Sequence, residues 1–507
     1  MIRARQLAGA SVGYGAVTIW LAFLGLLTTP YLLHQLGRSF YGVFALITIM
    51  TAYLSNLELG FGGATVRFLA RARGRADEDE ERRVLGTSLA VFLVAATLAG
   101  VIALLASAFI AGNFVRGSDA LHEQALDAIR IGALILSVSL ISSFAGASLQ
   151  ALGRFQVVLG TRVVFGTMSS AGAVTAVATG GGLRTVLGVQ GVISVALCLV
   201  LLVALTRATT CRLRPSFDRK MLRSMAGFGG LVLLAGLAYQ VILQGPPSVL
   251  AGHAPTSELA AFAVPSTILQ QLIVLGSATS LGFLSFASAA SADEDRSQLA
   301  AVFRANVRLT LLAMGPVAAF LIVFGRPLLS TWIDAGFAAD AVGPLRWLAI
   351  AALMISLSAP VADVARGLGR PAWVVWFTVV AAALALGGSF ALVSGHGAAG
   401  VAGAMAIALV ATVVPFAIIV GWKLLSSSPR WLAGAMARPV AAVALCALAF
   451  VIGSEASSSF ASAIVTGALV TTAYLALAFR FVLDDRERAA LRRPGSARGR
   501  LRREAPA

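Results

Sequence analysis

"YGVFALITIMTAYLSNLELGFGGATVRFLARARGR", residues 41–75, begins as an apolar run and ends in glycines and arginines. The hydrocarbon core of a bilayer is roughly 30 Å thick, so a helix needs about 20 predominantly apolar residues to cross it. Runs of that length recur along nearly the whole chain. Because they are continuous rather than alternating in hydropathy, they predict membrane-spanning helices and argue against a β-barrel.

The composition agrees with a membrane protein. Of the 507 residues, 58% are hydrophobic and only 12% are charged, whereas soluble domains carry about 25% charged residues. We therefore expect an all-α polytopic membrane protein with about fourteen spans and an uncleaved first helix. The spans lie near residues 11–34, 41–69, 84–112, 127–150, 155–179, 184–206, 225–250, 256–284, 304–327, 343–366, 371–394, 397–423, 431–452 and 460–481.

The distribution of basic residues predicts the topology. The net charge is +17, which in a soluble protein would suggest nucleic acid as a partner. With both termini in the cytoplasm, however, 33 of the 39 Lys and Arg residues fall on the cytoplasmic side and 6 on the other. The positive-inside rule therefore accounts for most of the charge, and we expect no nucleic-acid partner.

An internal repeat recurs at one constant offset along the chain. "ADED" at 76–79 returns at 292–295, "ALGR" at 151–154 returns as "GLGR" at 367–370, and Pro30 matches Pro246. The offset equals six spans, an even number, so the two copies keep the same orientation in the membrane. Parallel repeats of this kind predict two helical bundles that alternate access to a central site.

The repeat sets the expected domain boundaries. Residues 1–210 form an N-terminal six-helix lobe and residues 211–424 a C-terminal six-helix lobe. Residues 425–483 add two helices, and 484–507 form a basic cytoplasmic tail that we expect to be disordered and able to bind anionic lipid. Duplication without transport is the competing interpretation of this plan.

The common motifs for enzymatic chemistry are absent from the sequence. Neither lysine stands in a P-loop, and no HExxH or GxSxG occurs. The three cysteines and four histidines show no metal-ligand spacing. We therefore expect no enzyme activity, no cofactor and no metal site.

Glu58 and Arg67 flank a glycine-rich patch at the cytoplasmic end of the second span. Ionisable residues inside a membrane are costly and suggest function. We expect Gly60, Gly62 and Gly63 to act as a hinge that exposes backbone N–H groups. Arginine and bare N–H groups both bind phosphate, so the patch predicts an anion-binding site. Alternatively, Arg67 extends to the lipid headgroups and Glu58 caps a kink.

Other polar residues complete the predicted cavity. Arg154, Arg162 and Arg308 are candidate cationic lining, although Arg154 matches Arg370 in the repeat and a role in anchoring the turn is the alternative. Asp363 and Arg366 are three residues apart, so a local ion pair competes with a role in coupling.

Two amides lie four residues apart in the seventh span. Gln240 and Gln244 precede "GPP" at 245–247. Amides both donate and accept hydrogen bonds, which suits sugar hydroxyls in a cavity. They suit hydrogen bonds between packed membrane helices equally well.

The run from His34 to Ala70 resembles the N-terminal signature of bacterial O-antigen-type polysaccharide flippases. The pattern falls on these residues: Leu36, Gly37, Tyr41, Gly42, Glu58, Leu59, Gly60, Gly62, Arg67 and Phe68. The resemblance implies membership of the superfamily that includes multidrug extruders and lipid-linked precursor flippases. It also implies a cationic central cavity and transfer of a polyprenyl-diphosphate-linked oligosaccharide to the outer leaflet of the bacterial inner membrane. A polysaccharide polymerase and glycosyltransferases are then candidate partners.

One departure from the family pattern concerns the seventh span. An acidic residue expected there is replaced by Gln240 and Gln244, which puts ion coupling through this lobe in doubt and leaves Glu58 and Asp363 as candidates. Three alternatives stay open: a multidrug-type antiporter, a membrane-embedded glycosyltransferase or polymerase, and a scaffold without transport. The few carboxylates inside the spans and the short outer segments weigh against the first two.

Overall fold

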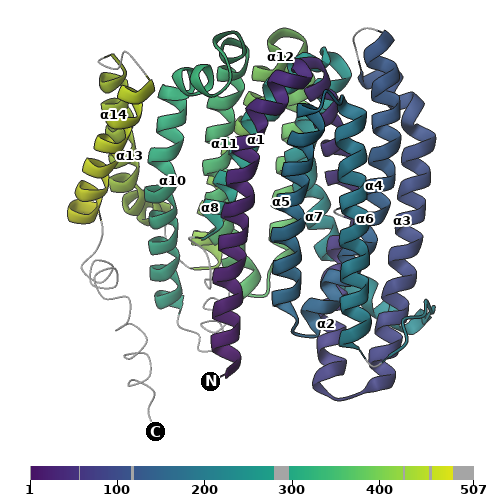
Figure 1. Ribbon diagram of the computed structural model, residues 1–507. Coiled ribbons are helices and arrows are strands. Elements are labelled where there is room, and N and C mark those ends of the chain that lie inside the picture. Colours follow the sequence, from purple (N-terminus) through teal and green to yellow (C-terminus); the bar gives the residue numbers. More distant parts are fainter. Residues whose placement is uncertain are drawn as a thin grey trace. The chain divides into compact units, whose positions relative to one another are not determined.

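The computed structural model describes residues 2–55, 57–115, 119–209, 211–278, 296–425, 429–455 and 460–482. Within these ranges the chain is helical and contains no strand (Figure 1). The helices are α1 (Ile2–Ser55), α2 (Leu57–Gly74), α3 (Glu78–Phe114), α4 (Asp119–Ala151), α5 (Phe155–Ala178), α6 (Leu183–Ala208), α7 (Arg219–His253), α8 (Thr256–Ala278), α10 (Arg296–Trp332), α11 (Ala335–Gly367), α12 (Pro371–Lys423), α13 (Pro429–Glu455) and α14 (Phe460–Leu477), which ends in a π-helical turn (Ala478–Val482).

Eleven helices of the described residues are long and apolar enough to cross a membrane. Two of them have too many residues for one crossing, because 54 residues in α1 and 53 in α12 would each measure about 80 Å as a straight helix. Each is kinked at a glycine, Gly37 (φ 79°) in α1 and Gly397 (φ 49°) in α12. Helix α12 therefore contains two of the predicted spans, whereas the predicted second span, 41–69, is divided between α1 and α2. The expected all-α polytopic fold is confirmed.

The helix boundaries follow the repeat found in the sequence. Helices α4 and α11 both have 33 residues, and the separation of their last residues equals the offset of the repeat. Helices α5 and α12 begin at the same offset. The kink at Gly37 corresponds to His253, where α7 ends, and Gly397 corresponds to Gly181, between α5 and α6. The second "ADED", at 292–295, lies outside the described residues.

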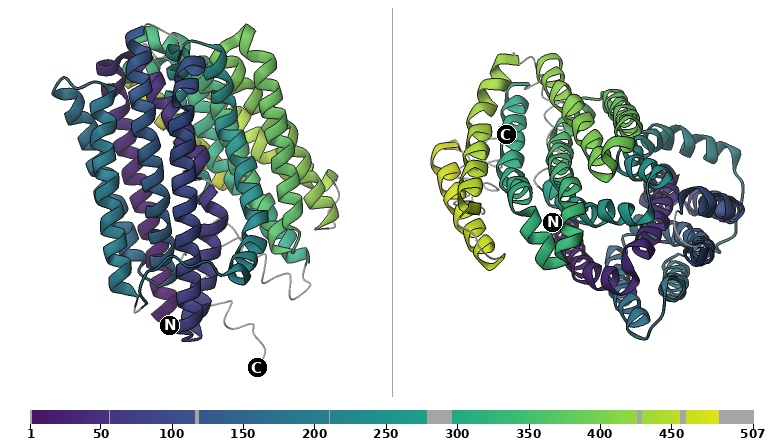
Figure 2. Two further views of the ribbon diagram at one scale, coloured as in Figure 1. Left: turned by 90° about the vertical axis from the view of Figure 1, so that its right-hand side faces the viewer. Right: turned by 90° about the horizontal axis from the view of Figure 1, so that it is seen from above.

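The chain forms two compact units. The first comprises residues 1–271 and 375–408, and the second comprises 272–374 and 409–507. In the first unit α3 packs on α4, α4 on α6, and α2 on α7. Figures 1 and 2 show α3, α4 and α6 side by side. Its core contains Phe92 and Phe144, whose ring centroids are 5.9 Å apart. The predicted boundary between lobes at residues 210 and 211 stays a prediction.

In the second unit the C-terminal helices α13 and α14 pack on α10 (Figure 1). Phe320 and Phe324 of α10 and Phe450 of α13 form a cluster of rings. Glycines permit the close approach, because a methyl group on Gly315 would overlap Val443 and one on Gly467 would come 2.6 Å from Phe320. The pair α13 and α14 thus shares an apolar core with α10.

Large apolar side chains are exposed along the outer helices. Leu105 of α3 is 79% exposed and Val192 of α6 is 72% exposed, with many similar residues around them. Soluble monomers rarely expose contiguous apolar patches beyond a few hundred Å². This surface therefore suits contact with lipid, and the chain is a multi-pass membrane protein.

Candidate functional site

Helix α2 has one buried face and one exposed face. Ala64, Thr65, Leu69 and Ala72 are buried at 0% exposure. The Thr65 hydroxyl donates a hydrogen bond of 2.8 Å to a carbonyl of its own helix and lies 3.0 Å from Ser88 Oγ of α3. The buried stripe packs against α3, α4 and α7 and fixes the direction in which the opposite face points.

The opposite face presents Gly63, Arg67 and Arg71, all exposed and spaced four residues apart. Side chains at i and i+4 are neighbours on a helix, so the two guanidinium groups share one side of α2. A methyl group placed on Gly62 or Gly63 would meet no atom within 4 Å. This face, which we call the α2 cationic face, offers two arginines and an uncrowded backbone. Arginine forms bidentate hydrogen bonds with phosphate, so the face can bind an anionic group.

The predicted glycine hinge lies within a regular helix. Residues 57–74 are helical throughout, so Gly62 and Gly63 have their N–H groups in the helical ladder rather than exposed for an anion. Glu58 lies in the first turn, where the helix dipole favours a carboxylate, but its side chain is outside the described residues. It stands roughly 13 Å from Arg67 along the axis, too far for direct contact. The hinge role of Gly60, Gly62 and Gly63 stays a prediction.

Arg73 belongs to an ion pair rather than to the α2 cationic face. Its Nη1 donates to Glu81 Oε2 over 3.1 Å, and the Glu81 side chain is only 3% exposed. The Thr209 hydroxyl donates to Glu81 Oε1 over 3.1 Å, which ties the start of α3 to the end of α6. Asp77 caps α3 by accepting from the N–H of Glu80 over 2.8 Å. Much of the charge in "RARGRADEDEER" therefore stabilises helix ends.

A polar row on α7 faces the end of α1. Gln240, Gln244 and Ser248 follow at intervals of four residues, and Ser248 Oγ donates to the Gln244 carbonyl over 2.7 Å. The Ser248 side chain also shares a hydrogen bond with Tyr53. Gln240 is buried and Gln244 half-buried. Because α2 packs on α7, this row and the α2 cationic face are carried by neighbouring helices of one unit.

Arg154 and Arg162 of the first unit have exposed side chains. The Arg154 N–H donates to the Leu149 carbonyl over 2.9 Å, and its repeat partner Arg370 donates to Ala365 over 2.8 Å. The main chain therefore forms the turn, and the Arg154 guanidinium does not cap α5. Arg162 lies inside a membrane-spanning helix, two turns after Arg154.

Arg308 and the pair formed by Asp363 and Arg366 belong to the second unit, whereas Arg67 and the polar row of α7 belong to the first. Arg308 Nη1 donates to the Val482 carbonyl over 3.4 Å, so it also supports the π-helical end of the chain's last described helix. The expected local ion pair is present, because Arg366 Nη1 donates to Asp363 Oδ1 over 3.2 Å. The role of these three residues in a shared cavity stays a prediction.

Three residues of the flippase-like signature between His34 and Ala70 have structural roles. Gly37 forms the kink of α1 with φ 79°, a conformation that favours glycine. Tyr41 is 5% exposed and shares a hydrogen bond with Thr29. A methyl group on Gly42 would overlap the Thr256 carbonyl of α8.

The hydrogen bond between Tyr53 and Ser248 was not predicted from the sequence, although the four-residue spacing from Gln244 could have indicated Ser248.

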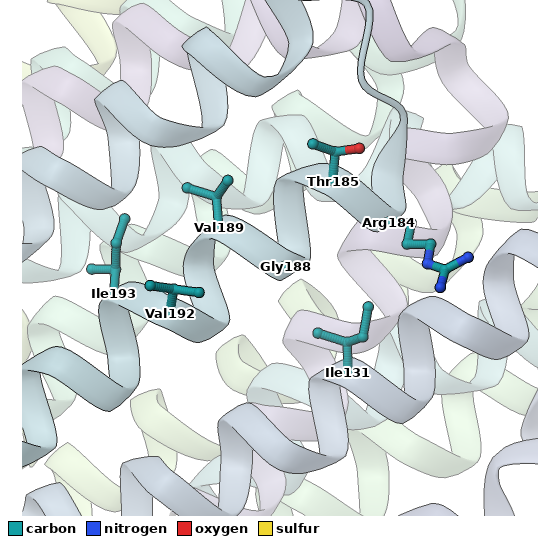
Figure 3. Close-up of a pocket in the computed structure, with 7 residues that line it drawn as sticks. All are labelled: Ile131, Arg184, Thr185, Gly188, Val189, Val192 and Ile193. Atoms are coloured by element: carbon teal, nitrogen blue, oxygen red, sulfur yellow. The ribbon is translucent and has the colours of Figure 1, made fainter.

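A second feature of the first unit is an aliphatic groove of about 530 Å³ on α4 and α6. Figure 3 shows Thr185, Val189, Val192 and Ile193 along α6, with Arg184 at one end. Arg184 Nη1 lies 3.4 Å from Asp127, which is also 3.8 Å from Arg130. The groove is open and mostly apolar, which suits an acyl chain of the surrounding bilayer.

Solved structures with the same fold are membrane transporters. The lipid II flippase MurJ in an inward closed conformation matches with a TM-score of 0.75 and 13% identity, covering 93% of this chain and 98% of that chain. A multidrug resistance MATE family transporter of the MOP superfamily, inward-facing, matches with a TM-score of 0.70 and 15% identity, covering 81% and 98%. A MOP superfamily transporter from Pyrococcus furiosus matches with a TM-score of 0.62 and 16% identity, covering 83% and 95%.

The fold and the membrane-spanning helices thus define a multi-pass membrane protein with the architecture of MOP superfamily transporters. Residues 34–336 match the family described as polysaccharide biosynthesis protein, and the chain belongs to that family. The match confirms the resemblance seen in the sequence between His34 and Ala70. No protein of curated function matches this chain in sequence.

Proposed function

We propose that the protein is a flippase that moves a polyprenyl-diphosphate-linked oligosaccharide from the inner to the outer leaflet by alternating access. Membership of a polysaccharide biosynthesis family supports a saccharide cargo. The fold shared with a lipid II flippase supports a lipid-linked one. The product would enter surface polysaccharide biosynthesis, with glycosyltransferases before this step and a polysaccharide polymerase after it.

The observation that carries this proposal is the α2 cationic face. Arg67 and Arg71 are both exposed on one side of a helix whose other side is fully packed. A diphosphate carries negative charge that two neighbouring arginines can bind. On α7, next to α2, the half-buried Gln244 can supply an amide to sugar groups, beside the buried Gln240 and the hydrogen-bonded Ser248. Glu58 and Asp363 are the candidates for cation coupling.

The proposed orientation puts both termini in the cytoplasm of a bacterial inner membrane. It rests on the distribution of Lys and Arg, 33 against 6. In this orientation the α2 cationic face lies at the cytoplasmic side, where a diphosphate lipid would enter. Transport is proposed as the whole activity, without enzymatic chemistry.

A deletion strain of the source bacterium tests the proposal. Lipid-linked saccharides would be extracted and assigned to a leaflet, with complementation by wild type, Arg67→Ala, Glu58→Gln and the control Arg82→Ala. Arg82 is an exposed arginine of α3 outside the α2 cationic face. We expect inward-facing saccharide to accumulate in the deletion and to persist with Arg67→Ala but not with Arg82→Ala. An unchanged lipid pool and unchanged surface polysaccharide in the deletion would refute the flippase.

An ion-coupled multidrug antiporter is the second candidate, because MATE transporters share the fold. It would confer resistance to cationic compounds in the same strains. Sensitivity of the deletion strain to such compounds, with normal polysaccharide, would favour it.

A further inference from the structure

The C-terminal helices, which lie outside the repeat, form a groove of about 740 Å³ within the second unit. Helices α13 and α14 and the π-helical turn line it, with Leu445, Ala449 and Leu477 among its apolar residues. Its size is typical of sites for small molecules, which run from about 300 to 1,000 Å³. Both helices are long and apolar enough to span a membrane, and the lining residues Leu445 and Leu477 are 66% and 57% exposed, so the groove is open to the surrounding hydrocarbon.

Two arginines lie at one end of this groove. Arg438 is in the first turns of α13, and Arg480 is in the π-helical turn that ends α14. Because the two helices form an antiparallel hairpin, their outer ends are neighbours, and both arginines line the same groove. Both are exposed. None of the residues that line the groove is a carboxylate, so its charged end is purely cationic.

The position of Arg480 is fixed by the packing of its neighbours in the chain. Ala478 and Val482 of the same turn are buried, and Tyr474 one turn earlier is 4% exposed. Arg308 of α10 donates to the Val482 carbonyl over 3.4 Å. Single π-helical turns are rare and occur frequently at functional sites. The turn holds Arg480 outward while its neighbours pack into the core shared with α10.

We propose that this groove binds an anionic glycerophospholipid of the membrane, with its phosphate between Arg438 and Arg480 and an acyl chain along Leu445, Ala449 and Leu477. Basic pockets between membrane helices are recognised sites for anionic headgroups. The apolar wall and the cationic end match the two parts of such a lipid. The proposal concerns a resident lipid rather than the transported one, so it stands apart from the proposed function.

The test uses the full-length protein in mild detergent and native mass spectrometry. Phosphatidylglycerol and phosphatidylcholine with identical acyl chains are titrated separately into wild type, Arg438→Gln/Arg480→Gln, Ala449→Trp and the control Arg370→Gln. Arg370 is an exposed arginine outside the groove. At about 1 kcal/mol for each arginine near an anionic headgroup, the double variant should bind phosphatidylglycerol about 25-fold more weakly. Ala449→Trp should also weaken binding, and Arg370→Gln should not.

Two results would overturn the proposal. One is equal binding of phosphatidylglycerol and phosphatidylcholine by wild type, a comparison that needs no variant to fold. The other is unchanged phosphatidylglycerol binding in the double variant. Displacement of phosphatidylglycerol from wild type by an equimolar amount of a polyprenyl diphosphate would assign the groove to that lipid instead. Leaflet assays of the deletion strain are independent of each of these outcomes.

Discussion

Gly153 and Gly369 occupy equivalent positions of the two repeats and adopt the same left-handed backbone conformation, with φ of 76° and 72°. Each follows a helix of 33 residues, and each donates its N–H to the carbonyl three residues before it over 3.0 Å. The next residue in each turn donates to the carbonyl five residues back. The two copies of the repeat therefore end this helix with the same turn and the same backbone hydrogen bonds.

Substitution of either glycine should destabilise the protein by a similar amount. An alanine in the left-handed region costs about 1–2 kcal/mol, whereas asparagine is tolerated better. We expect Gly153→Ala and Gly369→Ala to lower the thermal unfolding midpoint in detergent and the two asparagine variants to recover part of the loss. If alanine lowers the unfolding midpoint at only one of the two positions, the two turns share a geometry but do not contribute equally to stability.

Gly42 and Gly62 should respond to alanine with opposite signs. A methyl group on Gly42 would overlap the Thr256 carbonyl, and backbone cannot move aside cheaply, so a loss of about 1–3 kcal/mol is expected. Gly62 faces open space inside a helix, where alanine is favoured by up to about 1 kcal/mol. Thermal unfolding of the two purified variants checks both signs. A stable Gly42→Ala variant would contradict the close approach of α1 and α8.

Arg73→Ala should cost more stability than Glu81→Gln. Arg73 is 51% exposed at its side chain and Glu81 only 3%, so loss of the arginine leaves a buried carboxylate whose charge is unbalanced. Breaking a buried pair costs about 3–5 kcal/mol, and we expect less here because one partner is half in water. Glutamine retains one oxygen that can accept from Arg73, and its amide N–H can donate to the Thr209 hydroxyl. Chemical unfolding should rank the variants, and the reverse order would show that Arg73 contributes little.

Tyr53 and Ser248 should be energetically coupled. Hydrogen bonds between membrane helices average about 0.6 kcal/mol in double-mutant cycles. A cycle with Tyr53→Phe and Ser248→Ala should therefore give a coupling energy near that value. Additive effects of the two substitutions would mean that the bond adds nothing to stability.

The spans could be predicted because hydropathy is a local property of roughly 20 consecutive residues. The same holds for the turn at Gly153 and the ion pair of Asp363 with Arg366, whose partners are close in the sequence. The breaks predicted between residues 34 and 41 and between 394 and 397 fall at Gly37 and Gly397, where the backbone leaves the helical conformation and two helices join at a kink.

The site was harder to predict because its contacts join distant parts of the sequence. Glu81 meets Thr209 across 128 residues, and Arg308 meets Val482 across 174. Arg308 was expected in a cavity, since its sequence neighbourhood gives no sign of a carbonyl from the last helix. Arg67 was identified because an arginine near the end of an apolar run stands out in the sequence itself.

The equal length of α4 and α11 limits how these helices can have changed over time. One inserted residue would rotate all following side chains by about 100° around the helix axis. It would thereby move buried residues toward lipid and lipid-facing residues into the core. Insertions and deletions inside these helices should therefore be rare, which agrees with the single offset that relates both the first and the last residues of α4 and α11.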